Sequence, residues 1–383
     1  MIISENVKYV GVYDADIGLF EGQYKVPEGI TYNSYLIFDE KTAVMDSVDA
    51  RCGKEWIENI KAALDGRSPD YLVVHHMEPD HSSSILLFAN EFPEARIVSS
   101  AKAFAMMKNF YGNDFVDNRI TVGEGSQLSL GKNTLTFYTA PMVHWPEVVV
   151  SYLSGEKILF SADGFGKFGA IDAEDWVDEA RRYYIGIVGK YGAQVQALLK
   201  KASALDIQTI CPLHGPVLKE NLGYYISLYD KWSSCTPEKE GVLVAYASVY
   251  GNTKKAALML ADELRRCGSE VSVLDLTRCD IKEAVARAFA YSKLALASIT
   301  YNAGLFPCMR EFISELSDRG YNNRAVGFIE NGSWAPMAAK TMRAAFEGMK
   351  NIKAAENGVK ILSGVSEANI EEIGKLAAEL AAI

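Results

Sequence analysis

Apolar residues in the first part of the chain recur with two different periods. Apolar residues at every second position predict strands, and apolar residues three and four positions apart predict helices that bury one face. The predicted strands are Tyr9–Tyr13, Thr31–Phe38, Thr42–Asp46, Tyr71–Val74 and a hairpin of Gln127–Leu130 and Thr134–Tyr138 that turns at Gly131-Lys132-Asn133. The predicted helices are Lys54–Leu64, Ser82–Phe92, Ala101–Phe110, Glu174–Tyr184 and Val195–Ala204. This order of elements predicts sheets that are faced by helices.

The pattern changes after about residue 240 to a strict alternation of strand and helix. The predicted strands are Val242–Ala247, Glu270–Leu274, Lys293–Ile299, Ala325–Glu330 and Gly358–Leu362. The predicted helices are Thr253–Arg266, Ile281–Ala290, Met309–Asp318, Ala335–Gly348 and Ile370–Ala381. Short apolar strands joined by crossover helices are typical of a doubly wound parallel sheet, here with five strands.

A short polar stretch with one proline, residues 231–240, separates these two regions. Such a composition predicts a linker. We therefore expect a first domain over residues 1–236 and a second over residues 241–383, and the length of 383 residues agrees with a chain of two or three domains.

Composition excludes several classes of protein. The formal net charge of −10 argues against a nucleic-acid-binding protein, which needs a basic surface. No apolar run approaches the roughly 18–20 residues of a membrane span, and the first residues lack the pattern of a signal peptide, so we expect a cytoplasmic protein without membrane contact. The six cysteines form no C-x-x-C pair, so any metal site must use histidine and carboxylate.

The chain has only five histidines, and all of them lie in or directly after apolar runs that are expected to be strands. Three fall within His75-His76-Met77-Glu78-Pro79-Asp80-His81, while His144 and His214 each end a later run, as does Asp163. A single histidine at a strand end is more often a hydrogen-bonded core residue than a metal ligand, but a random chain rarely confines every histidine to such places. The candidate metal ligands are His76, Glu78, Asp80, His81, His144, Asp163 and His214.

This set of four imidazoles and three carboxylates is sufficient for two metal ions with one carboxylate between them. Nitrogen and oxygen ligands without thiolate suit iron, manganese or zinc, and the anionic ligands favour iron. We expect His75 to support the site rather than to bind metal, because neighbouring residues in an extended segment point in opposite directions.

A second constellation follows the first strand of the C-terminal region. Ser248-Val249-Tyr250-Gly251-Asn252-Thr253 leads directly into a helix, where hydroxyls and free backbone N–H groups form a cradle for an anion. The segment lacks the lysine of the G-x-x-x-x-G-K-[ST] nucleotide loop and resembles the flavodoxin loop that holds the phosphate of FMN. Two more loops lie at predicted strand ends, with Tyr301 and Trp334 as candidates to stack on a flavin ring. The candidate FMN-binding residues are Ser248, Tyr250, Gly251, Asn252, Thr253, Thr300, Tyr301, Asn302, Ala303, Gly304, Asn331, Gly332, Ser333 and Trp334.

The spacing H-x-E-x-D-H, followed by His144, Asp163 and His214, resembles the metallo-β-lactamase superfamily. Hydrolases of that superfamily carry a second histidine where this chain has Glu78, and the glutamate is the pattern of the flavodiiron proteins. That resemblance implies an N-terminal αββα metallo-β-lactamase-like sandwich followed by a flavodoxin-like domain. It also implies the distribution of ligands: His76, Glu78 and His144 on one iron, Asp80, His81 and His214 on the other, and Asp163 bridging the two.

The resemblance further implies a reductase that passes electrons from FMN to a di-iron centre, which reduces O₂ to water, NO to N₂O, or both. Electrons would come from an external donor, either a rubredoxin-like carrier or a reduced deazaflavin, and the family's assembly would be a head-to-tail homodimer or a dimer of such dimers. Tyr191 lies where related proteins place an aromatic residue near the oxidant, although a packing role is about as compatible with the sequence.

Two alternatives stand beside this interpretation. One is a zinc-dependent hydrolase regulated by a fused flavodoxin domain, against which Glu78 argues. The other is a flavin electron carrier with a vestigial metal domain, against which the complete ligand set argues.

Overall fold

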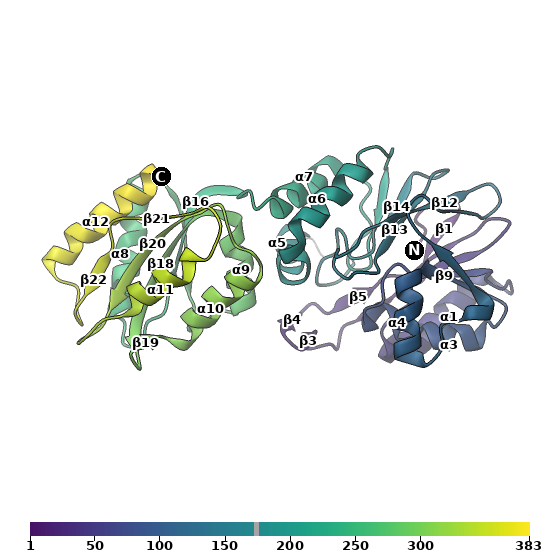
Figure 1. The fold of residues 1–383 in the computed structure, drawn as a ribbon, viewed down its shortest axis with the longest axis horizontal. Helices are drawn as coiled ribbons and strands as arrows, with labels where there is room; N and C mark the ends of the chain where they lie inside the picture. The colour runs from purple at the N-terminus through teal and green to yellow at the C-terminus, as the bar shows by residue number, and fades with distance from the viewer. Residues whose placement is uncertain (172–175) are drawn as a thin grey trace. The chain divides into compact units, whose positions relative to one another are not determined.

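The computed structural model describes residues 1–171 and 176–383, which form two compact units, Met1–Asp230 and Lys231–Ile383 (Figure 1). The polar stretch 231–240 is not a free linker as predicted. Helix α7 (Leu222–Ser233) extends into it, and strand β16 (Lys239–Tyr246) begins before it ends. The predicted helix over Glu174–Tyr184 lies partly outside the described residues, and its described part is α5 (Trp176–Tyr183).

The first unit contains two main sheets. The six-stranded sheet has the order β1 (Val7–Tyr9), β6 (Tyr35–Ile37), β7 (Ala43–Met45), β8 (Tyr71–Val73), β9 (Arg96–Ser100), β10 (Arg119–Val122). The five-stranded sheet has the order β11 (Gln127–Ser129), β12 (Thr134–Thr139), β13 (Val149–Leu153), β14 (Ile158–Phe160), β15 (Thr209–Cys211). Two small ribbons complete the strands: β2 (Val12–Asp14) with β5 (Ile30–Tyr32), and β3 (Leu19–Phe20) with β4 (Tyr24–Lys25). The hairpin predicted around Gly131 is confirmed as the antiparallel pair β11 and β12.

The two sheets enclose one core and carry helices on their outer faces. Side chains such as Val73, Val98, Phe137 and Phe160 fill the space between the sheets. On the outer face of the first sheet lie α1 (Gly53–Leu64), α3 (Ile85–Glu91) and α4 (Ala101–Tyr111), and near the second sheet lie α5, α6 (Gly192–Ala202) and α7 (Figure 1). This is the αββα sandwich that the resemblance implied.

Three predicted elements of the first unit are each divided in two. Tyr9–Tyr13 separates into β1 and β2, because the backbone at Gly11 approaches the carbonyl of Tyr32 so closely that a Cβ would lie 2.4 Å from its oxygen. Thr31–Phe38 separates into β5 and β6. The predicted helix Ser82–Phe92 is a one-turn helix α2 (Pro79–Ser82) followed by α3. These breaks follow from tertiary contacts that a local pattern does not contain.

The second unit is a doubly wound parallel sheet, as predicted. Its main order is β17 (Glu270–Asp275), β16, β18 (Tyr291–Tyr301), β20 (Arg324–Asn331), β21 (Ile352–Ala354), and β22 (Val359–Ile361) also pairs with β20. Helices α8 (Asn252–Arg266) and α12 (Glu367–Ala382) cover one face, while α9 (Ile281–Ala290), α10 (Pro307–Asp318) and α11 (Ala338–Glu347) cover the other (Figure 1). The sequence pattern missed β21 and the short β19 (Gly304–Leu305), which have no apolar run of their own. In the described parts of the chain, no helix combines the length and apolarity that a bilayer crossing requires.

Candidate metal centre and cofactor cleft

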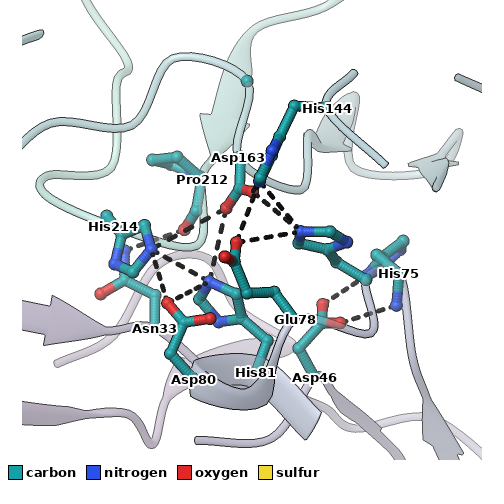
Figure 2. Close-up of polar contacts among 12 residues, drawn as sticks. Asn33, Asp46, His75, Glu78, Asp80, His81, His144, Asp163, Pro212 and His214 are labelled. Carbon is teal, nitrogen blue, oxygen red and sulfur yellow. Dashed lines mark hydrogen bonds and ion pairs between the residues drawn. The ribbon is translucent and has the colours of Figure 1, made fainter. Parts of the chain in front are cut away.

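The seven predicted metal ligands converge at one edge of the first unit's two sheets. His76 and Glu78 follow β8, and Asp80 and His81 lie in α2, which starts at Pro79 because the fixed φ of proline suits the first position of a helix. His144 follows β12, Asp163 follows β14 and His214 follows β15. Segments that are up to 138 residues apart in the chain therefore meet in one cluster, which Figure 2 shows.

The cluster consists of two groups of metal-binding atoms. In the first group, Nε2 of His144 lies 2.9 Å from Oε2 of Glu78 and 3.3 Å from Nε2 of His76. In the second group, Nε2 of His81 lies 3.0 Å from Nε2 of His214, and each of these nitrogens lies 3.2 Å from Oδ2 of Asp80. The two groups have the composition of two separate metal sites.

Asp163 lies between the two groups and directs one oxygen to each. Its Oδ2 lies 3.2 Å from Nε2 of both His76 and His144, and its Oδ1 lies 3.4 Å from Nε2 of His81 and 3.8 Å from that of His214. Figure 2 shows this carboxylate in the middle of the dashed contacts. A carboxylate in this position can bridge two metal ions.

Polar groups behind the cluster hold two of the imidazoles by their second nitrogen. Nδ1 of His76 is 2.8 Å from Oε1 of the buried Glu147, and Nδ1 of His214 is 2.6 Å from the carbonyl oxygen of Thr31. Such partners orient a ring and select the tautomer whose Nε2 lone pair faces a metal. The sequence analysis did not identify Glu147 as a partner of a metal-site histidine. A carboxylate three residues after the candidate ligand His144 could have indicated such a role.

His75 lies outside the cluster, as expected. Its Nδ1 contacts the carboxylate of Asp46, which also accepts a hydrogen bond from the backbone N–H of His75, and its Nε2 is 2.8 Å from Oγ of Ser151. These bonds tie the backbone just before His76 to the two sheets.

The cluster concentrates buried negative charge. Burial raises the pKa of Asp80 to about 7, and the charges of Glu78 and Asp163 add to this effect. Burial also opposes ionisation of Asp163, but the nearby His76, His144 and His81 hold its pKa well below its usual value. Burial lowers the pKa of His144, yet its contacts with Asp163 and Glu78 raise it to about 9. The raised pKa of His144 thus reflects its carboxylate partners, and the lowered pKa of Asp163 reflects the imidazoles around it.

The unsatisfied atoms of the cluster fit bound metal. Both carboxylate oxygens of Asp80 and of Asp163 are buried, and they make no hydrogen bond within the described residues. Buried charged oxygens without such bonds are costly unless they bind a cation. The donor set and these oxygens therefore fit two metal ions, as predicted from the sequence.

Aromatic residues surround the His214 side of the cluster. The rings of Phe20, Tyr32 and Tyr183 have their centres 5.5, 6.0 and 5.4 Å from that of His214. Tyr183 is buried, and burial together with the charges of Asp163, Asp80 and Glu78 raises its pKa well above its usual value. Tyr191, the predicted aromatic neighbour, lies in a partly exposed turn and makes no hydrogen bond or ring contact with the cluster in the described residues, so its role stays a prediction. Tyr183 lies on the buried face of α5, so the apolar pattern of the helix predicted over Glu174–Tyr184 could have indicated it.

The second unit contains a cavity of about 590 Å³ at the carboxyl ends of its strands. Twelve of the fourteen predicted FMN-binding residues line it, and Gly251 and Gly304 do not. The lining residues that sequence reasoning missed are Val249, Ile299, Ala335 and Ser363. Ser363 follows β22, so the rule that placed the other loops at strand ends would also have found it.

The loop before α8 has the features of an anion site. Gly251 has φ +92°, a left-handed conformation that suits glycine, and its N–H donates to Oγ of Ser248 over 3.2 Å. Oγ1 of Thr253, in the first turn of α8, is buried and has no hydrogen-bond partner in the described residues. A buried hydroxyl at a helix N-terminus fits a bound phosphate group.

The other loops of the cavity are held from behind. Oγ1 of Thr300 accepts hydrogen bonds from the backbone N–H groups of Met337 and Ala338, so a residue near the end of β18 stabilises the start of α11. Tyr301 is 47% and Trp334 83% exposed, which leaves both rings available to a flat ligand. The volume, the phosphate loop and these rings fit FMN.

Comparisons with known proteins agree with this structure. The model of the ODP family of beta-lactamases matches residues 30–215, and the flavodoxin model matches residues 244–365. A nitric oxide reductase of Moorella thermoacetica is 31% identical over 369 residues, which cover 93% of this chain and 92% of that protein.

Two solved structures extend the comparison to three dimensions. The rubredoxin oxygen:oxidoreductase of Desulfovibrio gigas has a TM-score of 0.92 at 26% identity, over all of this chain and 98% of that one. The flavodiiron protein of Giardia intestinalis also has a TM-score of 0.92, at 29% identity, over 99% of this chain and 95% of that one.

A paired-metal cluster in a lactamase-like domain, together with a flavodoxin domain in the same chain, defines an oxidoreductase that uses FMN and two iron ions. The relatives share both domains in this order over nearly their full length. The chain belongs to the flavodiiron protein family.

Proposed function

We propose that this protein is a flavodiiron reductase in which electrons pass from FMN to a di-iron centre that reduces O₂ to water, NO to N₂O, or both. The observation that carries the proposal is the position of Asp163 between two groups of ligands, one of which includes Glu78. The names of the relatives, a nitric oxide reductase and a rubredoxin oxygen:oxidoreductase, support both substrates and do not rank them.

In the proposed centre, His76, Glu78 and His144 would hold one iron, Asp80, His81 and His214 would hold the other, and Asp163 would contribute to both. When bound, FMN accepts electrons one or two at a time, and an iron pair stores two of them. The chain's own contribution is orientation and charge. Glu147 and the carbonyl of Thr31 fix two of the imidazoles, and three carboxylates offset the charge of the metal.

In the proposed flavin site, the loop Ser248–Thr253 holds the phosphate and the loops after β18 and β20 flank the ring. Tyr301 and Trp334 are the stacking candidates. Tyr250 is 95% exposed at the same cavity, and exposed aromatic rings of this kind are available to a second protein surface.

The partners complete the proposal. We infer an external electron donor, either a rubredoxin-like carrier or a reduced deazaflavin, because the chain has no C-x-x-C iron centre of its own. We also propose a head-to-tail homodimer or a dimer of dimers, and a cytoplasmic location. Sedimentation of the FMN-loaded protein would distinguish a monomer from these assemblies.

The hydrolase alternative is not favoured. Zinc hydrolases of the superfamily place histidine where this chain has Glu78, whose Oε2 lies 2.9 Å from Nε2 of His144 inside the first group. Two relatives that span both domains, those of Moorella thermoacetica and Desulfovibrio gigas, are oxidoreductases by name.

The first test is the metal and flavin content of protein purified from iron-replete cells, followed by consumption of O₂ and of NO by the photoreduced protein. We expect about two irons and one FMN per chain. Zinc in place of iron, with an activity that survives removal of FMN, would overturn the proposal.

The Asp163→Ala variant tests the bridge. Removing the carboxylate leaves each ligand group with one donor fewer, so we expect less than half of the wild-type iron and a fall in turnover of at least about 100-fold. FMN content should not change, because the flavin cavity lies in the other unit. An Asp163→Ala protein that kept wild-type turnover would remove the cluster from the mechanism and favour the simple electron carrier.

A further inference from the structure

A second, much smaller cavity lies behind the metal cluster in the first unit. It lies between the outer face of the second sheet, at Val150 of β13 and Leu159 of β14, and the half-buried side of α6 that carries Val195 and Leu198. We propose that this cavity binds a small apolar gas molecule and supplies it to the metal cluster. The supply step rests on the proposed function, whereas gas binding does not.

The wall that faces the cavity is apolar. Four lining residues, Tyr138, Ser161, Lys201 and Tyr229, carry polar side-chain atoms, and the polar atoms of three of them are engaged elsewhere. Oγ of Ser161 donates to the carbonyl of Gly164, the hydroxyl of Tyr229 accepts from the backbone N–H of Phe165, and Nζ of Lys201 contacts Glu124 and the carbonyl of Thr139. A buried water needs two to four polar partners, and none of these three groups offers one to the cavity. The cavity is therefore suited to an apolar occupant.

The volume limits that occupant to a few atoms. The cavity measures about 30 Å³, and a single water requires roughly 10–15 Å³ by the same measure. A diatomic gas or a xenon atom fits, while a flavin, a nucleotide or a peptide side chain does not. Apolar cavities in proteins stay dry and take up such gases.

The cavity reaches the backbone that carries two ligands of the cluster. Val143 lines it and directly precedes His144, and Gly164 lines it and directly follows Asp163. Figure 2 shows His144 and Asp163 entering the cluster next to each other. The cavity therefore adjoins the two backbone segments that carry His144 and Asp163.

Gly164 and Phe165 shape the end of the cavity that is nearest the cluster. A Cβ on Gly164 would lie 2.9 Å from the carbonyl oxygen of Ser161, so the close turn requires glycine. The ring of Phe165 stacks on Tyr229, with the two ring centres 4.2 Å apart. These contacts keep the cavity at a fixed width beside the loop of Asp163.

The test uses xenon and two matched variants of the full chain. Crystals of the FMN- and iron-loaded protein under xenon pressure should show xenon between Val150 and α6. Ala202→Leu fills the cavity from the last turn of α6, and Ala197→Leu makes the same change at an exposed position of the same helix. Leu205→Phe is a second filling variant in case the first does not fold.

We expect Ala202→Leu to lose the xenon and to lower kcat/KM for the gaseous oxidant by about fivefold at unchanged kcat, since supply and not chemistry is affected. Ala197→Leu should keep the xenon and the wild-type kcat/KM. Absence of xenon from the wild-type cavity, or equal kcat/KM in the two alanine variants, would overturn the inference. Xenon in the cavity of a protein that reduces neither O₂ nor NO would instead contradict the proposed function and leave the gas site standing.

Discussion

Each imidazole of the metal cluster directs Nε2 toward the cluster, so the partner of Nδ1 decides how firmly the ring is held. His76 has a charged partner in Glu147, and His214 has a backbone carbonyl. Nδ1 of His81 is buried without a partner in the described residues. Glu147 also accepts the backbone N–H of Met77 over 2.8 Å, so a single carboxylate fixes both the ring and the loop that carries Glu78.

The residue-scale prediction concerns Glu147→Gln. The amide oxygen of glutamine can still accept both hydrogen bonds that Oε1 of Glu147 accepts, but it lacks the charge that raises the basicity of His76. We expect iron affinity to fall about 10- to 100-fold, measured by competition with a chelator, with the fold unchanged in circular dichroism. Glu91→Gln is the matched control, because Glu91 pairs with Lys61 on the surface of the first unit. Equal iron affinity in both variants would show that Glu147 does not hold the metal ligand.

At the scale of elements, the N-terminus of α8 provides the groups that can bind the phosphate of a ligand in the flavin cavity. The helix begins at Asn252, directly after the left-handed Gly251, and its first backbone N–H groups face the cavity loop. The positive end of the helix dipole and the free hydroxyl of Thr253 act on the same place.

The element-scale prediction is that Thr253→Val weakens FMN binding about 10-fold or more, since a hydrogen bond to a charged group contributes about 1.5–3 kcal/mol. Fluorescence titration of the apoprotein with FMN measures the change, and titration with riboflavin, which has no phosphate, should give wild-type affinity. Thr341→Val on α11 is the control, because its hydroxyl donates to the carbonyl of Met337, the N-cap residue of that helix, and Thr341 does not line the cavity. An unchanged FMN affinity would place the phosphate elsewhere.

At the scale of the whole molecule, each unit contains its own core, but the boundary lies earlier than the composition indicates. Trp232 and Cys235 are buried in the second unit. Nη1 of the buried Arg324 donates to the carbonyl of Cys235 over 2.6 Å, and Nε1 of Trp232 donates to Glu238 over 2.7 Å. The segment that was predicted as a linker thus belongs to the packing of the flavodoxin unit.

The whole-molecule prediction compares two fragments, residues 231–383 and residues 241–383. Both should bind FMN equally well, because every residue that lines the flavin cavity lies after residue 247. The shorter fragment should be less stable by about 1.5–3 kcal/mol in urea unfolding, since it leaves a buried guanidinium short of an acceptor. Equal stability of the two fragments would return the boundary to residue 241.

The alternation of strands and helices after residue 240 was predictable because each strand there is a separate apolar run buried on both faces. The cluster was predictable for a related reason: the carboxyl ends of strands share one edge of a fold, and all five histidines occur in or directly after such strand-like runs. The break between α2 and α3 in the segment predicted as the helix Ser82–Phe92 was not predicted, although it falls at Ser83 and Ser84, and serine favours helix caps over helix interiors.

The sequence by itself indicated the fold class, the two kinds of cofactor site and the seven residues that meet in the cluster, because those depend on local periodicity, on residue type and on motif spacing. Only the tertiary structure decided which oxygen of Asp163 faces which group, that Glu147 and Thr31 hold the imidazoles, and that Tyr183 lies beside His214. The apolar cavity that Val143 and Gly164 line is likewise visible only in the tertiary structure. These features join residues from separate strands and helices, and their distances depend on how whole elements pack against one another.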